Sequence, residues 1–374
     1  MELGLLPALG SGIGDLHQTG QASRLIEGYL RPYARAFERV WYFSYLPEAL
    51  GDFVHDDELS GSVRVLGPRA RAPRALRALS MAPRHRREFA RCAVFRVFQV
   101  TGVIPALIAR AWWGTPFVTT YGFWYARLSR PGPSRMAKRV LERVALRSAA
   151  GVIVTTEALR AHAATITPSD RIHLIPNGVD LARFTPAKPS VRRGGRILYL
   201  GRLSEEKNLS VLVQAVGALH PRVPCRLVMV GAGRLHGRLV VEAAAAGIPA
   251  EFPGVLDHRL VAEKLREADV FVLPSFTEGH PKALIEAMAI GLPCVVSDCA
   301  GNRALVRDGH TGLLFDARDP RALAACLERV LTDEPLAAAL GRHARDLIAS
   351  EYDLERLVAT EIELLKRVAR AQSR

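Results

Sequence analysis

The chain has 374 residues, of which 49% are hydrophobic and 24% charged, so it is long enough to bury the cores of two domains. No apolar run reaches the length of a membrane-spanning helix, and the start MELGLLPALGSG lacks the basic and apolar regions of a signal peptide. The formal net charge of +14 is uneven, because residues 1–180 hold 24 Lys and Arg against 14 Asp and Glu.

Short apolar runs typical of buried strands alternate with helical patterns in the first half. A glycine-bearing loop is expected at residues 10–20, after the first strand. Near-continuous apolarity at 94–100 suits a strand buried on both faces. We expect helices at 21–37 and 137–149, strands at 2–9, 39–46, 62–68, 94–100, 115–124 and 151–156, and a closing segment at 171–180.

Residues 184–195, with two prolines, two glycines and a basic cluster, indicate a linker, after which the alternation starts again. The pattern predicts strands at 196–204, 225–233, 249–255, 269–275 and 293–298, and helices at 208–219, 234–247, 258–268, 282–290, 319–331 and from 335 to the end.

Strand–helix alternation twice over predicts an α/β chain with two Rossmann-like, doubly wound parallel sheets. We expect an N-terminal domain at 1–186, a second domain at 187–350 and a C-terminal helix at 351–374. Ligands of such folds bind beyond the carboxyl ends of the strands, so two facing domains would form a cleft between them.

Five cysteines lie along the chain without a CxxC pair: Cys92, Cys225, Cys294, Cys299 and Cys326. Their odd number and wide spacing argue against a disulfide framework or a zinc site. We expect reduced, mostly buried thiols in a cytosolic protein.

The stretch 64–96 holds ten arginines and one acidic residue, Glu88. Such a patch attracts anionic lipid head groups, phosphorylated substrates or nucleic acid, and the plain alternative is a solvated arginine-rich surface. No nucleic-acid module accompanies it, so we expect no nucleic-acid partner.

The stretch TEGHPKALIEAMAIGLP (277–293) places two glutamates around the start of a short helix. Pro281 suits the first helical position and Gly291 suits the stop. Free N–H groups at 281–284 would form an anion site, with Glu278 just before the helix and Glu286 in its second turn. One carboxylate for each sugar, with a pyrophosphate between them, describes a nucleotide-sugar site. An amphipathic helix with two solvated glutamates is the alternative.

Two cations are expected at the same end of the same sheet. In LGRLSEEKNLSVL, Arg202 follows a strand and Lys207 precedes the next helix. Together they suit the neutralisation of a diphosphate leaving group, and a solvated loop is the alternative.

These segments resemble the retaining glycosyltransferases of family 4, which have the GT-B fold. The residues that carry the resemblance are LIPNGVDLARFTP (174–186), GRLSEEKN (201–208), VGAG (230–233), SFTEGHPKALIEAMAIGLPCVV (275–296) and DGHTGLLF (308–315). The match is nearly continuous from about residue 140 to 350 and holds only in outline before 135.

The resemblance implies a metal-independent transferase that needs no cofactor beyond its nucleotide-diphosphate sugar donor and acts on a glycan or lipid-linked acceptor. Arg202 and Lys207 would hold the diphosphate, Glu278 the donor sugar and Glu286 the ribose. The other implied donor contacts are Gly279, His280, Pro281, Lys282, Ala283 and Leu284, then Val255 at the base with Asp257 as a weaker candidate, and Gly12 and Gly14 near the phosphates. The C-terminal helix would cross back onto the first domain.

Two features depart from the family pattern. Many relatives carry a histidine where this chain has Tyr121, which either donates a hydrogen bond on the acceptor side or packs as an aromatic. His280 and Lys282 stand where apolar residues are common, and they face either the donor sugar or solvent.

The residues indicate a reaction driven by the leaving group, without an evident nucleophile, through an oxocarbenium-like transition state. Leu76 and Leu79 among the arginines of 64–96 suit shallow insertion, so we expect peripheral attachment to the cytoplasmic face of the plasma membrane. A non-catalytic GT-B scaffold and a nucleotide-sugar epimerase remain the alternatives.

Overall fold

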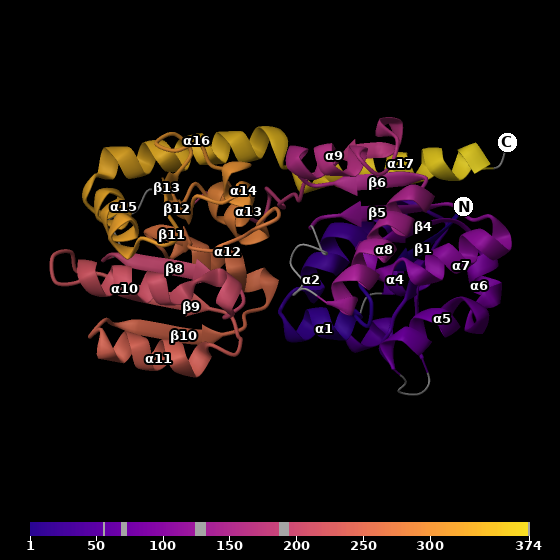
Figure 1. Ribbon diagram of the computed structural model, residues 1–374, viewed down its shortest axis with the longest axis horizontal. Helices are drawn as coiled ribbons and strands as arrows, with labels where there is room; N and C mark the ends of the chain where they lie inside the picture. Colours follow the sequence, from indigo (N-terminus) through magenta and orange to yellow (C-terminus); the bar gives the residue numbers. More distant parts are fainter. Residues whose placement is uncertain (55–56, 69–72, 124–131, 187–193, 373–374) are drawn as a thin grey trace. The chain divides into compact units, whose positions relative to one another are not determined.

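The computed structural model describes residues 1–54, 57–68, 73–123, 132–186 and 194–372. The chain forms two compact units (Figure 1). Unit 1 comprises Met1–Pro176 and Arg356–Arg374, and unit 2 comprises Asn177–Glu355. Most of the predicted linker at 184–195 lies outside the described residues, because these exclude 187–193. The predicted domain boundary between 186 and 187 stands at the edge of that gap.

The described part of unit 1 contains a seven-stranded sheet in the order β3-β2-β1-β4-β5-β6-β7, and all neighbours are parallel. Its strands are β1 Glu2–Leu6, β2 Arg39–Phe43, β3 Val63–Leu66, β4 Cys92–Val97, β5 Phe117–Tyr121, β6 Gly151–Val154 and β7 Ile172–Leu174. Its helices are α1 Ile13–Gln18, α2 Ala22–Leu25, α3 Arg31–Ala36, α4 Asp57–Ser62, α5 Arg74–Arg84, α6 Arg86–Arg91, α7 Ile104–Trp113, α8 Pro133–Ser148, α9 Glu157–Ala164 and α17 Leu354–Gln372.

Strand β4 lies next to β1 in the sheet, and its apolar side chains are buried as predicted. Phe43, Phe89 and Phe95 pack with ring centroids 4.2 and 4.9 Å apart. The exception on β4 is Arg96, which is buried and pairs with Glu361 of α17 at 2.5 Å. The hydroxyl of Tyr33 also donates to Glu361, so α17 is fastened to the first unit by a buried polar cluster.

The described part of unit 2 contains a six-stranded sheet in the order β10-β9-β8-β11-β12-β13, again with parallel neighbours. Its strands are β8 Arg196–Leu200, β9 Arg226–Val230, β10 Ala250–Gly254, β11 Val270–Leu273, β12 Cys294–Ser297 and β13 Leu313–Phe315. Its helices are α10 Leu209–Leu219, α11 His236–Ala245, α12 His258–Arg266, α13 Lys282–Ala289, α14 Ala300–Arg303, α15 Pro320–Thr332 and α16 Glu334–Glu351.

Both sheets confirm the predicted doubly wound architecture. In each, the strand order reverses at the first strand of the unit, β1 or β8, which is the switch point beyond which α/β folds bind ligands. Buried β-branched and aliphatic side chains of the strands form each core together with the apolar faces of the helices. The fold therefore places the loops that follow β8 and β11 together at one edge of the unit 2 sheet.

Several local expectations need correction. A helix, α1, begins at Ile13 inside the expected loop 10–20. The predicted helix 21–37 is interrupted by a π-helical turn at Ile26–Leu30. Pro281 is the N-cap of α13 rather than its first residue, with extended backbone. Gly291 does end α13, in the left-handed region at φ 78°.

The basic stretch 64–96 is not a uniform charged surface. Arg96 is buried, Arg91 pairs with Glu2 at 2.6 Å, and Arg77 donates to the Tyr45 carbonyl. Residues 69–72 lie outside the described residues. Helix α5 does expose Leu76 and Leu79, by 57% and 54%, while Ala78 and Met81 face the core.

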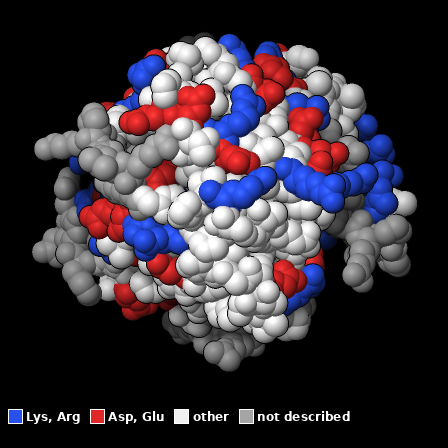
Figure 2. Space-filling view, turned by 90° about the vertical axis from the view of Figure 1, so that its left-hand side faces the viewer, with Lys and Arg blue, Asp and Glu red and all other residues white. Residues whose placement is uncertain are grey.

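One face of the molecule carries charges of both signs (Figure 2), and most of the cysteines are buried. On the face shown in Figure 2, positive and negative side chains are interspersed above a largely uncharged area, so that face carries no single-sign charge. All five cysteines are free thiols, and four are buried, as expected. None of the described helices is long and apolar enough to cross a membrane.

Candidate functional site

The loops that follow β8 and β9 lie in direct backbone contact. Gly231 has φ 135°, and a Cβ built on it would lie 1.9 Å from the carbonyl oxygen of Gly201. No other residue fits this approach, because it would combine an unfavourable backbone region with a clash. The VGAG segment therefore serves to bring two loops together at the carboxyl edge of the sheet.

Lys207 and Glu278, singled out separately in the sequence, are paired in the structure. The Lys207 Nζ donates to Glu278 Oε1 at 2.6 Å, and Ser275 Oγ donates to the same oxygen at 2.6 Å. The side chains of Lys207 and Glu278 are 16% and 6% exposed. The carboxylate is therefore fixed by two donors.

Further hydrogen bonds lock the loops that carry this pair. Asn208, in the left-handed region at φ 54°, donates from Nδ2 to the carbonyls of Pro274 at 3.1 Å and Ala317 at 2.7 Å. The N–H of Phe276 donates to the Glu206 carbonyl at 3.0 Å. The turn after β8 and the loop after β11 thus form one rigid body, as a site that must hold its ligand precisely placed requires.

Arg202 lies beside this body with its side chain 76% exposed. Its guanidinium contacts Glu206 at 3.3 Å, and its carbonyl accepts from the Tyr199 hydroxyl at 2.7 Å. Burial, with Glu278 and Glu206 nearby, raises the pKa of Tyr199, so this hydroxyl stays protonated and keeps donating. Arg202 is thus an exposed cation on a fixed backbone.

The first turn of α13 offers backbone N–H groups at the same edge. Pro281 has no N–H, so the predicted donor at that position is wrong. None of the described residues accepts from the N–H groups of Ala283 and Leu284. A Cβ on Gly301 would lie 2.5 Å from the Glu278 carbonyl, so the start of α14 packs directly against the loop of Glu278 and Gly279.

Glu286 has a buried partner that sequence reasoning missed. Its Oε1 lies 2.8 Å from His258 Nε2, and the two side chains are 3% and 6% exposed. The His258 ring packs on Phe184, with centroids 5.5 Å apart, and its Nδ1 is buried without a partner among the described residues. The carboxylate is therefore held in place rather than solvated.

His280 faces the protein interior rather than solvent. It is 5% exposed, its Nδ1 accepts from the Asn177 N–H at 3.3 Å, and its carbonyl accepts from Asn177 Nδ2 at 2.8 Å. Burial, with a smaller contribution from Lys282, lowers the pKa of His280 to about 4. A neutral imidazole thus ties the loop before α13 to the start of unit 2, while the Lys282 side chain is exposed.

The two candidates for the base have different surroundings. Val255 follows β10 and is 41% exposed, which leaves its side chain accessible. Asp257 is the N-cap of α12, accepts from the Arg259 N–H at 2.8 Å and pairs with the Arg259 guanidinium. Its capping role accounts for an aspartate at this position.

In unit 1, the glycine loop is bound to a carboxylate of the chain itself. Glu48 accepts from the N–H groups of Ile13 at 2.8 Å and Gly14 at 2.7 Å, and a Cβ on Gly12 would lie 2.5 Å from Glu48 Oε1. Ser44 donates to the same carboxylate. Glu48 therefore makes the close approach to the backbone that Gly12 and Gly14 permit.

Tyr121 is fully buried. Its hydroxyl donates to Glu142 at 2.8 Å and its ring stacks on His162, with centroids 5.9 Å apart. These contacts favour the packing interpretation, and its assignment to the acceptor side stays a prediction.

Sequence reasoning missed Glu48, Asn208 and His258, whose partners lie 28 or more residues away, and Ser275, whose partner Glu278 is three residues away. Ser275 and Asn208 stood inside the quoted motifs, and a count of hydrogen-bonding side chains there would have found them. Nothing in the sequence connects His258 with Glu286. Among the described residues, no three His, Cys, Asp or Glu side chains are grouped as a metal site.

Comparison with known proteins covers both units. A family model described as glycosyl transferases group 1 matches residues 194–333, and one described as glycosyltransferase family 4 matches residues 22–183. The chain is 34% identical over 210 residues to D-inositol 3-phosphate glycosyltransferase of Paenarthrobacter aurescens, covering 52% of this chain and 51% of that protein. It is 30% identical over 212 residues to the amylovoran biosynthesis glycosyltransferase AmsK of Erwinia amylovora, covering 54% and 52%. The matched segments span about half the length of these curated relatives.

Solved structures show the same fold. Sucrose-phosphate synthase from Thermosynechococcus elongatus superposes with a TM-score of 0.80 at 21% identity, over 99% of this chain and 100% of that one. Anabaena HepE, in a complex with UDP and glucose, gives a TM-score of 0.80 at 18% identity, over 98% and 100%. Two parallel α/β units of the GT-B type are therefore shared with both.

Proposed function

The chain belongs to the group 1, family 4 glycosyltransferases, and we propose that it transfers a sugar from a UDP- or GDP-linked donor to a glycan or lipid-linked acceptor. The anomeric configuration of the sugar is retained. The observation that carries the proposal is the charged cluster at the carboxyl edge of the unit 2 sheet, where Lys207 pairs with Glu278 and Arg202 stays exposed.

The cations bind the diphosphate of the donor. Lys207 uses one of its three N–H donors on Glu278, which leaves the others for phosphate oxygens. Arg202 adds a bidentate donor, and the N–H groups of Ala283 and Leu284 add the positive end of a helix dipole. As the bond between the anomeric carbon and the phosphate oxygen breaks, its electron pair passes to the diphosphate, where these groups stabilise it.

Glu278 positions the donor sugar. Its carboxylate is fixed by Lys207 and Ser275 and accepts hydrogen bonds from sugar hydroxyls. The acceptor hydroxyl attacks the anomeric carbon from the side of the leaving group and passes its proton to a phosphate oxygen. A covalent glycosyl-enzyme trapped by mass spectrometry would contradict this route.

The nucleoside lies further along α13. Glu286 accepts from the two ribose hydroxyls and Val255 contacts the base. The pairing of Glu286 with His258 supports this assignment, because it fixes the orientation of the carboxylate that accepts from the ribose. His280 and Pro281 shape the loop, and Gly279 and Lys282 complete the donor contacts.

Unit 1 supplies the acceptor side. Gly12 and Gly14 approach the donor phosphates in the working enzyme, in competition with Glu48, and Tyr121 supports the acceptor side from the interior. Two matched relatives are named for inositol 3-phosphate and for amylovoran synthesis, which favours polysaccharide or glycolipid synthesis here.

An acceptor on a lipid would require contact with the inner face of the plasma membrane. Exposed Leu76 and Leu79 on α5, next to the arginines of the stretch 64–96, support attachment to anionic lipid. Flotation with liposomes tests this: binding should require anionic lipid and weaken in the double variant Leu76→Ser/Leu79→Ser. Flotation that does not depend on lipid charge would exclude attachment to anionic lipid.

The function is tested by incubating the chain with UDP- and GDP-sugars and following all products by NMR. A transferase slowly transfers the sugar to water, and this releases nucleoside diphosphate and a free sugar of retained configuration. A binding scaffold would leave the donor intact, and an epimerase would convert it into another nucleotide sugar.

A further inference from the structure

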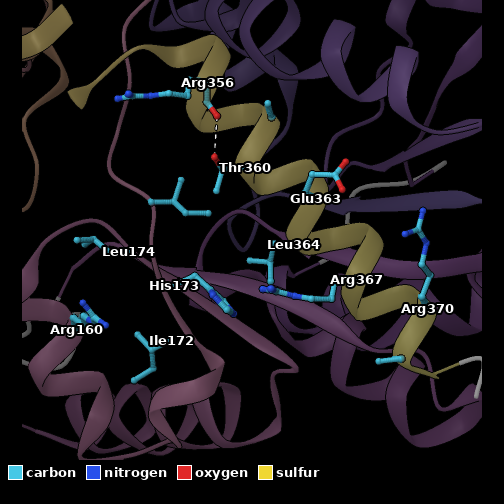
Figure 3. A pocket seen from close by; sticks show the side chains of 13 residues that line it. Arg160, Ile172, His173, Leu174, Arg356, Thr360, Glu363, Leu364, Arg367 and Arg370 are labelled. Carbon is cyan, nitrogen blue, oxygen red and sulfur yellow. Dashed lines mark hydrogen bonds between the residues drawn. The ribbon is translucent and has the colours of Figure 1, made fainter. Parts of the chain in front are cut away.

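A groove outside the proposed donor site runs along unit 1 between the edge strand β7 and helix α17 (Figure 3). It has a volume of about 1220 Å³, and all its lining residues belong to unit 1. Pockets that hold small organic ligands have volumes of about 300–1,000 Å³, so this groove is large enough for one.

The lining combines positive charge with apolar surface. It contains four arginines and one histidine but a single carboxylate, Glu363, which pairs with Lys366 at 3.3 Å. Arg160, on α9, makes only a weak exposed contact with Glu157 at 3.4 Å. Arg367, on α17, pairs with no carboxylate among the described residues. Among the described residues, the lining of the groove therefore carries a net positive charge.

The charged side chains lie on both margins of the groove (Figure 3). Figure 3 shows His173 and Arg367 lying side by side across the groove, Arg160 near Leu174 on the other margin, and the Glu363 carboxylate turned away. Leu174 is 40% exposed although it lies in a strand, whereas Leu364 on α17 is buried. Cations thus flank an exposed apolar surface.

We propose that this groove binds a phosphate ester, with the phosphate against Arg367 and His173 and the apolar part on Leu174 (Figure 3). The planar guanidinium of Arg367 offers paired donors to phosphate oxygens. The groove lies within unit 1 and shares no residue with the charged cluster of unit 2, so it is a second ligand site. Both an anionic lipid head group and a free phosphorylated metabolite have this chemistry.

The pKa of His173 should show whether the groove holds a phosphate. Burial lowers the pKa of His173, Arg367 lowers it further, and Asp170 opposes them. A phosphate next to the ring adds a negative charge that stabilises the imidazolium, so binding raises this pKa.

The experiment is an NMR titration of the His173 imidazole in the full chain, with the resonance assigned by its loss in His173→Gln. Inorganic phosphate is one probe and dihexanoyl phosphatidic acid, kept below its micelle concentration, is the other. Arg367→Gln should weaken phosphate binding about tenfold, the loss expected for one charge-assisted contact. Arg143→Gln, an exposed arginine on α8 with the same change of charge, is the matched control and should leave it unchanged.

The two probes separate the sources. Tighter binding of the lipid than of phosphate supports a lipid head group, and equal binding supports a phosphorylated metabolite. The proposal is overturned if neither probe raises the His173 pKa, or if Arg367→Gln and Arg143→Gln bind phosphate alike.

Discussion

Both units bury ion pairs beside a parallel sheet, but the pairs have different neighbours. In unit 1, Arg96 and Glu361 are each 5% exposed, and Arg96 also donates to the Val97 carbonyl at 2.7 Å. In unit 2, Lys207 and Glu278 are also largely buried, yet Arg202 lies exposed beside them. Burial of charge alone therefore does not mark a site; an accessible charge next to a fixed pair does.

Helix α1 of unit 1 and helix α13 of unit 2 differ in the same way at their N-termini. The N–H groups of Ile13 and Gly14 at the start of α1 are bound to Glu48. None of the described residues accepts from Ala283 and Leu284 at the start of α13. The start of α1 has its donors bound by the chain itself, whereas the start of α13 leaves donors available for a ligand.

The largest expected effect is on stability and lies in unit 1. Burial alone would lower the pKa of Arg96, but Glu361 raises it above its ordinary value, so the guanidinium stays charged. Glu361→Ala leaves that charge buried and unpaired, which should lower the free energy of unfolding by about 3–5 kcal/mol. Denaturant titration measures this. Glu363→Ala, exposed on the same helix, should change stability by less than about 0.5 kcal/mol.

The counterpart in unit 2 should affect catalysis instead. Arg202→Ala removes an exposed cation, so the melting temperature should stay unchanged. Loss of one group that stabilises the leaving charge should lower kcat/KM about 100- to 1000-fold. Steady-state kinetics with the donor identified below measures it. If Arg202→Ala had the same kcat/KM as the wild-type chain, an exposed cation would not distinguish the Lys207–Glu278 pair from the Arg96–Glu361 pair.

A pH effect should be specific to the loop before α13. Because the folded pKa of His280 is about 4 and the unfolded value is about 6.5, the unfolded chain binds the proton more tightly. The stability contributed by neutral His280 is complete above pH 6.5 and is lost as the pH falls towards 4. Between pH 7 and 4.5 the loss should be about 2–3 kcal/mol, and His280→Gln should remove that part of the dependence. A variant with the wild-type pH profile would show that His280 is not responsible.

The smallest effect concerns the buried partner of Glu286. His258→Gln should loosen the carboxylate and raise the KM for the donor about tenfold, with kcat nearly unchanged, since the contact orients the nucleoside and not the reacting atoms. His236→Gln, at an exposed position of unit 2, serves as control. A fall in kcat with unchanged KM would place His258 elsewhere in the mechanism.

The fold was predictable because its signals are local. Apolar runs of strand length and helix stops such as Gly291 are read within a few residues, and the alternation then dictates two parallel sheets. Pairings such as Lys207 with Glu278 and Arg96 with Glu361 were not predictable, because they depend on which loops the strand order brings together. Arg96 illustrates the limit: as one of ten arginines in 64–96 it resembled surface charge, and only its partner 265 residues away shows that it is internal.

The most direct test of the donor site is a thermal-shift panel of UDP-, GDP- and ADP-sugars, with and without magnesium, on the wild-type chain and on Glu286→Ala. A ligand that binds only the folded state raises the melting temperature. The account predicts a shift from one nucleotide family that ignores magnesium and disappears in Glu286→Ala. No shift from any donor, or a shift that Glu286→Ala retains in full, would contradict it.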